Sequence, residues 1–163
     1  MKPGTIPPLS ICPDCGAPVP GGREGCQALW NAIAAQAFTD LQYASVRDLA
    51  FDAYCMQHLE RYCRSAKSYA AHLTRLCCGL EYAGNPQVYA AIQNWLNGTP
   101  PVSRPQDLPF LGKITVADVA AAQTGDAFRM LAHEWAESVW EAYTPQQALA
   151  RSWVRLALGR VKL

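Results

Sequence analysis

The first 25 residues contain six prolines and five glycines, and this density limits the fold more than any other feature. Proline lacks a backbone N–H and glycine is conformationally loose, so no regular element is expected there. The segment also carries Cys12-Pro13-Asp14-Cys15-Gly16. Ligation of a metal by these cysteines is a candidate source of the order that the segment otherwise lacks. We therefore expect a loop over residues 1–25 that is held by a metal ion.

The spacing of Cys12 and Cys15 favours zinc. Two thiolates two residues apart in a tight turn can face one cation, and Gly16 can adopt the positive φ that such a turn commonly needs. Thiolate softness and tetrahedral geometry suit zinc, with iron as the lesser alternative. A redox Cys-x-x-Cys motif would instead follow a strand and open a helix, whereas here the flanks are rich in proline.

A structural zinc ion takes four protein ligands, so two more are needed. Cys26 follows Cys15 by eleven residues, at the expected start of a helix. Helices over 26–38 and 41–58 share a short turn and should pack antiparallel, which brings His58 to the level of Cys26. The predicted ligands are Cys12, Cys15, Cys26 and His58, and the alternatives for the fourth ligand are His72 and Cys55.

From Cys26 onward, apolar residues recur at helical spacing, and no five-residue stretch alternates as a strand does. Thr39 or Asp40 can cap one helix, and Asn85 can cap another that begins with proline. The expected helices cover residues 26–38, 41–58, 65–82, 87–96, 115–122, 127–143 and 144–158. The fold class is therefore all-α, a bundle of about seven helices preceded by a zinc-knuckle loop.

A chain of 163 residues suggests a single domain over 1–163. Within it we distinguish the knuckle segment, two groups of helices and a connection between them that holds four prolines. These parts span residues 1–25, 26–98, 99–113 and 114–163.

Charge and cysteine content exclude several classes of protein. Fourteen Lys and Arg balance thirteen Asp and Glu, which argues against a nucleic-acid partner. The basic end formed by Arg151, Arg155, Arg160 and Lys162 is what a helix dipole alone favours. No apolar run is long enough for a membrane span. Seven cysteines, an odd number, without a secretion signal indicate a reducing cytoplasm.

Several motifs together resemble one uncharacterised bacterial family, a domain of unknown function whose members begin with a CPxCG knuckle. The motifs occur in order over nearly the whole chain. They are Cys12-Pro13-x-Cys15-Gly16, Gly25-Cys26-x-x-Leu29, Phe51-Asp52-Ala53-Tyr54-x-x-Gln57-His58, Ser65-x-x-Ser68-x-x-x-His72-Leu73 and Trp135-Ala136-x-x-Val139-Trp140. The resemblance implies a small helical fold but no activity.

This sequence departs from the family pattern at three places. Members of the family have His where Arg47 stands, Pro where Leu59 stands and a His-His pair where Gln146 and Gln147 stand. Any catalytic role of those histidines is lost here. The retained cysteines and histidines fit a structural metal better than a catalytic one.

We therefore expect a zinc-stabilised binding or assembly module that acts on another protein. The alternative is a metal-dependent hydrolase with its site between the second and third helices. Separately, Ser65, Ser68 and His72 share one helical face and Asp52 lies on the preceding helix, so a Ser–His–Asp relay can be considered. Capping and inter-helix hydrogen bonds account for the same residues more simply.

Overall fold

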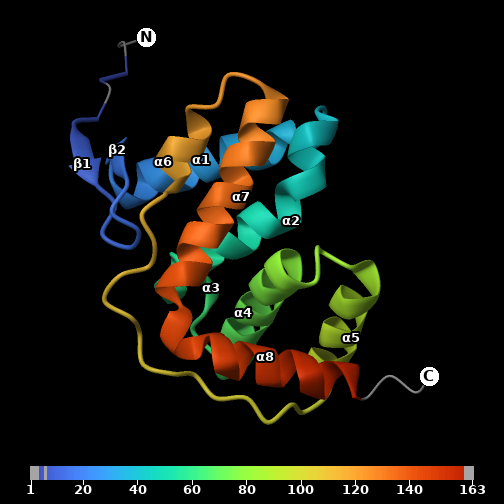
Figure 1. The fold of residues 1–163 in the computed structure, drawn as a ribbon. Coiled ribbons are helices and arrows are strands. Elements are labelled where there is room, and N and C mark those ends of the chain that lie inside the picture. The colour runs from blue at the N-terminus through green and yellow to red at the C-terminus, as the bar shows by residue number, and fades with distance from the viewer. Residues whose placement is uncertain (1–3, 6, 160–163) are drawn as a thin grey trace.

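The computed structural model describes residues 4–5 and 7–159 of the chain, and within them helices dominate (Figure 1). The predicted all-α class is confirmed, with eight helices in the described part and one small β-ribbon. The elements are β1 (Leu9–Ile11), β2 (Pro18–Pro20), α1 (Arg23–Gln36), α2 (Leu41–Met56), α3 (Leu59–Tyr62), α4 (Ala66–Glu81), α5 (Pro86–Asn97), α6 (Val116–Ala120), α7 (Gly125–Ala142) and α8 (Thr144–Leu158).

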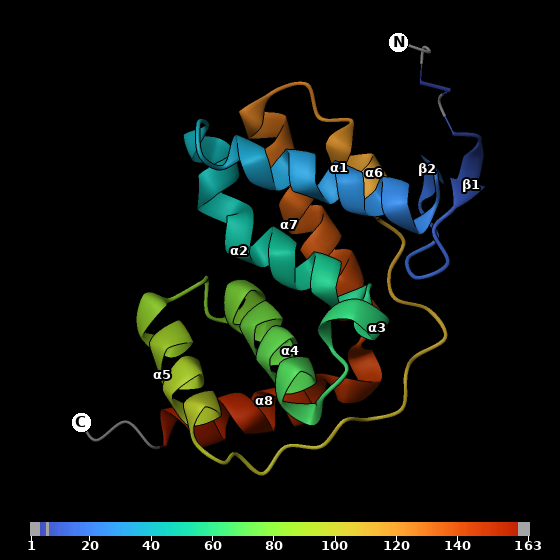
Figure 2. The same ribbon diagram turned by 180° about the vertical axis from the view of Figure 1, so that it is seen from behind.

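The helices form two groups joined through α2 and α7. Helix α2 makes its most extensive contact with α7 and also packs on α4, while α1 lies on α2 and α6. Helix α8 crosses α4 and α5 on the opposite side of the molecule from the ribbon (Figures 1 and 2). The ribbon lies at the end of α1 where that helix begins. The site therefore forms where the ribbon meets the α1–α2–α7 group.

The predicted helices are present because their apolar positions share one face and their ends are capped. The carboxylate of Asp40 accepts a hydrogen bond from the Gln42 backbone N–H at 2.8 Å, and the Asn85 side chain caps α5 in the same way. Thr144, however, does not cap α8. Its hydroxyl donates to the Glu141 carbonyl at 2.6 Å, because α8 follows α7 with only one residue between them.

The β-ribbon corrects the expectation that residues 1–25 hold no regular element. Strands β1 and β2 pair antiparallel, with Ser10 opposite Val19. The backbone N–H of Cys12 donates to the Ala17 carbonyl in the same register. Hydrogen-bonded pairs alternate along an antiparallel ladder, so Pro18 falls at a position where no N–H is required. A short ribbon is therefore compatible with the prolines of this segment. The high content of proline and glycine did not predict it.

Helix α1 begins at Arg23, three residues earlier than expected, and places Cys26 inside its first turn. Gly25 permits this start because it lies against β2: a Cβ there would come within 1.8 Å of the Pro20 carbonyl oxygen. Helix α2 ends at Met56 rather than at residue 58, and the short α3 follows it. Four-residue helices leave too weak a periodicity to be predicted from sequence.

The expected proline-rich connection runs along the outside of the molecule from α5, past α8, to α6 beside the ribbon (Figures 1 and 2). Its last part is held by the buried side chain of Gln57, which donates to the carbonyls of Leu111 and Ile114 at 3.1 and 2.9 Å. The indole N–H of Trp135 donates to the same side chain at 2.9 Å. One glutamine therefore ties the connection to α7 and to the end of α2.

The described helices also bear on the membrane question. None of them combines the length and apolar character that crossing a bilayer requires.

Candidate metal centre

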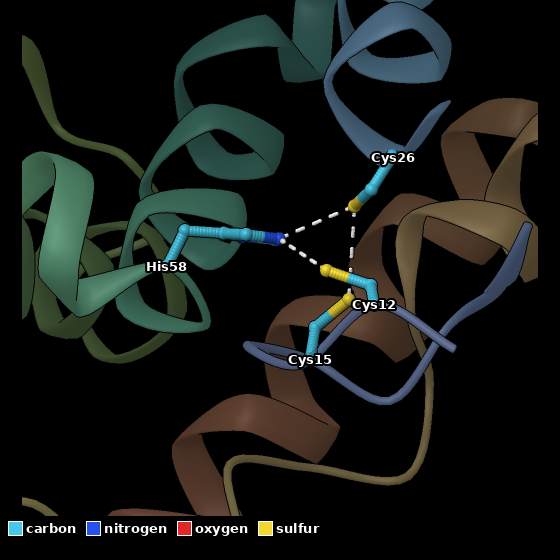
Figure 3. A group of neighbouring side chains, drawn as sticks. All are labelled: Cys12, Cys15, Cys26 and His58. Carbon is cyan, nitrogen blue, oxygen red and sulfur yellow. Dashed lines mark hydrogen bonds between the residues drawn. The ribbon is translucent and has the colours of Figure 1, made fainter. Parts of the chain in front are cut away.

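Three cysteine sulfurs and one imidazole converge at the junction of the ribbon, α1 and the α2–α3 link (Figure 3). The ligand atoms of Cys12, Cys15, Cys26 and His58 all lie within 4.8 Å of one another. Cys12, Cys26 and His58 are buried and Cys15 is half-buried. The structure thus brings together the four side chains predicted from the sequence.

The spacing of these atoms fits a tetrahedral ion. Zn–S bonds of about 2.3 Å and Zn–N bonds of about 2.0 Å set S···S edges of about 3.8 Å and S···N edges of about 3.5 Å. The Sγ atoms of Cys15 and Cys26 are 3.7 Å apart. The Nε2 of His58 lies 3.2 Å from the Cys26 Sγ and 3.8 Å from the Cys12 Sγ. Three of the six distances in the cluster are therefore close to those of a tetrahedral Cys₃His site.

Local backbone geometry presents the first two cysteines on one side of the knuckle. The N–H of Gly16 donates to the Cys12 carbonyl at 2.9 Å, and Gly16 has a φ of 79°. This is the left-handed conformation that glycine adopts without strain. Arg23, in the first turn of α1, makes a bidentate ion pair with Asp14 of the knuckle, at 2.7 and 2.9 Å. The ion pair holds the knuckle against α1 from outside.

The tautomer of His58 follows from its second nitrogen. His58 Nδ1 lies 2.6 Å from the backbone carbonyl of Tyr54. A carbonyl only accepts, so Nδ1 carries the proton and the lone pair of Nε2 points at the sulfurs. His58 follows Tyr54 by four residues, which is about one helical turn. This spacing is the signal in the sequence from which the hydrogen bond could have been predicted.

Without a metal ion, two of the cluster thiols are held in their neutral form. The hydrogen bond with Cys26, followed by burial, raises the pKa of the Cys15 thiol to about 12. Burial raises the pKa of Cys12 as well. A dication reverses this situation, because it deprotonates the thiols that coordinate it and compensates their charge.

The two alternative ligands lie elsewhere. The Nδ1 of His72 is 2.9 Å from the buried carboxylate of Asp52, which also accepts from the Arg75 guanidinium at 3.2 Å. Cys55 is buried beside Cys63, whose thiol donates to the Cys55 carbonyl at 3.6 Å. Of the three candidates for the fourth position, the structure brings only His58 to the three cysteines.

Of the Ser–His–Asp relay considered from the sequence, the structure contains the contact between aspartate and histidine. Ser68 has another role. Asp52 and His72 are in contact, but Ser68 pairs with Ser65 in a capping box at the start of α4. The Ser68 N–H donates to the Ser65 hydroxyl at 3.0 Å, and the Ser68 hydroxyl donates to the Ser65 carbonyl at 3.1 Å. Ser68 therefore serves to start the helix.

Three of the positions at which the sequence is expected to depart from the family pattern have local contacts of their own. Gln146 is buried and accepts a hydrogen bond from the Tyr69 hydroxyl, while Gln147 donates to the Trp140 carbonyl at 2.9 Å. Arg47 is exposed, and its Nε lies 3.3 Å from Asp48. None of them belongs to the cluster.

The basic C-terminal end is only partly described. The guanidinium of Arg151 donates to the Glu81 carboxylate at 2.9 Å. Arg155 is exposed, and Arg160 and Lys162 lie outside the described residues.

Fold and cluster together define a helical protein with a Cys₃His group built into the junction of a β-ribbon and two helices. The chain belongs to DUF5946, a family of unknown function, whose model matches residues 10–144. The matched region contains all four cluster residues. No curated protein and no solved structure matches this chain.

Proposed function

We propose that this protein binds one structural zinc ion through Cys12, Cys15, Cys26 and His58, and that the zinc-stabilised fold is a binding or assembly module for another protein. The observation that carries the proposal is the closed donor set. Four protein side chains supply four ligand atoms within 4.8 Å of one another.

A complete donor set favours a structural over a catalytic ion. A catalytic zinc ion has three protein ligands and keeps its fourth position for water or substrate, whereas structural sites are filled by protein. Here three of the four ligand residues are also buried. The metal-dependent hydrolase would require a vacant coordination position, and the geometry offers a protein atom at each of the four corners.

The donor chemistry favours zinc among the biological metals. Three thiolates and one imidazole match the soft and borderline ligands of tetrahedral zinc. All seven cysteines are free thiols. The proposal therefore assigns the protein to a reducing compartment such as the cytoplasm, where thiols persist.

Exposed apolar side chains near the knuckle support the binding role. Leu9 and Ile11 on β1 are 70% and 61% exposed, and Phe110 of the connection is 55% exposed. Phe110 and Pro13 of the knuckle line the same pocket of about 410 Å³. Side chains of this kind, fixed next to a rigid metal site, are suited to contact an apolar segment of a partner protein.

Metal analysis of the purified protein tests the structural assignment. We expect one zinc ion per chain and an X-ray absorption spectrum with three sulfurs and one nitrogen in the first shell. The closed donor set predicts no oxygen ligand. Two sulfurs with an exchangeable oxygen would favour the hydrolase, and a chain purified without metal that cannot be loaded with zinc would contradict the proposal.

Surface variants test the binding role. Ile11→Ser and Phe110→Ser should each weaken capture of a partner from an extract of the source cells at least about tenfold, since buried apolar side chains dominate such contacts. Phe38→Ser is the matched control, because Phe38 is 84% exposed but follows the far end of α1. Equal capture by all three variants would argue against a partner surface beside the knuckle.

A further inference from the structure

The three cysteines of the cluster differ in their exposure to solvent. Cys12 and Cys26 are fully buried, but Cys15 is half-buried and lines the pocket of about 410 Å³ beside the connection. Leu108, Pro109 and Phe110 form the other wall of that pocket. Cys15 is therefore the cluster cysteine with the most exposure to solvent.

Cys15 also faces a second sulfur. Its Sγ lies 3.7 Å from that of Cys26, whereas the nearby Cys12 Sγ approaches the His58 imidazole at 3.8 Å (Figure 3). A disulfide needs its two sulfurs to come to about 2 Å apart, which is a small movement from this starting point. This contact brings a bond between the knuckle and α1 within reach, while the sulfurs of Cys12 and Cys15 lie within 4.8 Å of one another.

The remaining four cysteines are protected from the same chemistry. Each is buried, and burial raises the pKa of its thiol: to about 12 for Cys63 and Cys77, to about 11 for Cys78, and further for Cys55. Because the thiolate is the nucleophile, these neutral thiols react slowly. The cluster, in contrast, has two cysteine sulfurs in contact beside a surface pocket, so oxidation is expected there.

We propose that the metal centre is a peroxide-sensitive modification site, at which Cys15 is oxidised and then joined to Cys26 by a disulfide while zinc is released. This inference rests on the proposed zinc site. It adds a reaction of that site with a small peroxide such as hydrogen peroxide.

The reaction has two balanced steps. The Cys15 thiolate attacks one oxygen of the peroxide, an S–O bond forms, the O–O bond breaks and hydroxide leaves, which gives a sulfenic acid. The Cys26 thiolate then attacks the Cys15 sulfur, an S–S bond forms, the S–O bond breaks and a second hydroxide leaves. Two protons from solvent convert the hydroxides to water, so the two thiolates lose two electrons and the peroxide gains them.

Oxidation would redistribute the links at the junction. The disulfide keeps the knuckle attached to α1, but Cys12 and His58 alone no longer provide the four ligands that hold zinc. The link from the knuckle to the α2–α3 segment, which His58 supplies, is lost. The oxidised protein thus keeps the link between the knuckle and α1 and loses the link between the knuckle and the α2–α3 segment.

Peroxide treatment of the zinc-loaded wild-type protein tests the proposal without a ligand variant. Released zinc is read with a chromogenic chelator, and free thiols are blocked at low pH before digestion. Cleavage after Arg23 and before Asp14 and Asp40 puts Cys12, Cys15 and Cys26 on separate peptides, 1–13, 14–23 and 24–39. Mass spectrometry then identifies which pair is joined.

We expect one zinc released per disulfide, with peptides 14–23 and 24–39 joined, and recovery of bound zinc after reduction in the presence of zinc. Cys55→Ala, which lies outside the cluster, should behave as wild type. Retained zinc, or peptide 1–13 joined to 14–23, would overturn this inference. Metal content before peroxide is measured separately, so failure of the zinc proposal remains distinguishable from failure of the redox inference.

Discussion

Cys12→Ala is expected to lower the free energy of unfolding of the zinc-loaded protein by at least about 3 kcal/mol, or roughly 6–12 °C in melting temperature. The variant removes one of four ligands from a site that joins the ribbon, α1 and the α2–α3 link. Binding that occurs only in the folded state contributes its free energy to folding. Thermal melting and urea titration with stoichiometric zinc measure the loss.

Cys55→Ala is the matched control for this prediction. Cys12 and Cys55 are both fully buried, so both substitutions remove the same atoms from a packed interior. Only Cys12 belongs to the cluster. A strong chelator should lower the melting temperature of the wild type and of Cys55→Ala, and leave Cys12→Ala nearly unchanged. Equal loss for the two variants, with no response to chelator, would show that no metal stabilises this fold.

Gln57→Leu is expected to cost about 3 kcal/mol or more, because one buried and two part-buried polar groups would lose their partner. These groups are the indole N–H of Trp135 and the carbonyls of Leu111 and Ile114. The end of the connection should also loosen. Denaturant unfolding gives the loss in stability, and the rate of tryptic cleavage after the exposed Lys113 reports the loosened connection.

Gln93→Leu provides the comparison, because Gln93 is exposed on α5 and its amide contacts only Asn97 at 2.8 Å. This variant should change stability by no more than about 0.5 kcal/mol. Trp135→Phe should fall between the two in its hydrogen-bond cost, since it leaves one acceptor on Gln57 unpaired. If Gln57→Leu proves as mild as the exposed control, the proposed role of this side chain is wrong.

The helices could be predicted because their signals are local. Apolar stripes such as Leu73 and Leu76 on α4 are buried as their spacing indicates. Capping by Asp40 and Asn85 depends on residues two positions away. The start of α1 could not be predicted in the same way. It depends on the close approach of Gly25 to β2, which no local pattern encodes.

That Cys12, Cys15, Cys26 and His58 lie close together could be predicted from chemistry combined with rough topology. The cysteine spacing indicated zinc, and antiparallel packing of the first two long helices brought His58 to the right level. The contacts that surround and support the cluster could not be predicted from the sequence. The Asp14–Arg23 ion pair joins residues nine positions apart, and the Gln57–Trp135 hydrogen bond joins residues 78 positions apart. Contacts of this range require the fold to be known first.

A row of stacked rings leads from the metal ligand into the protein. The His58 ring stacks on Tyr54 with centroids 4.0 Å apart, and Tyr54 stacks on Trp30 at 5.0 Å. We expect the fluorescence of this indole, two rings from His58, to respond to a metal bound at the proposed site. Cobalt(II), whose thiolate absorption overlaps indole emission, would dim the fluorescence of Trp30. The filling of the proposed site should then be measurable from the protein's own fluorescence, without an added dye.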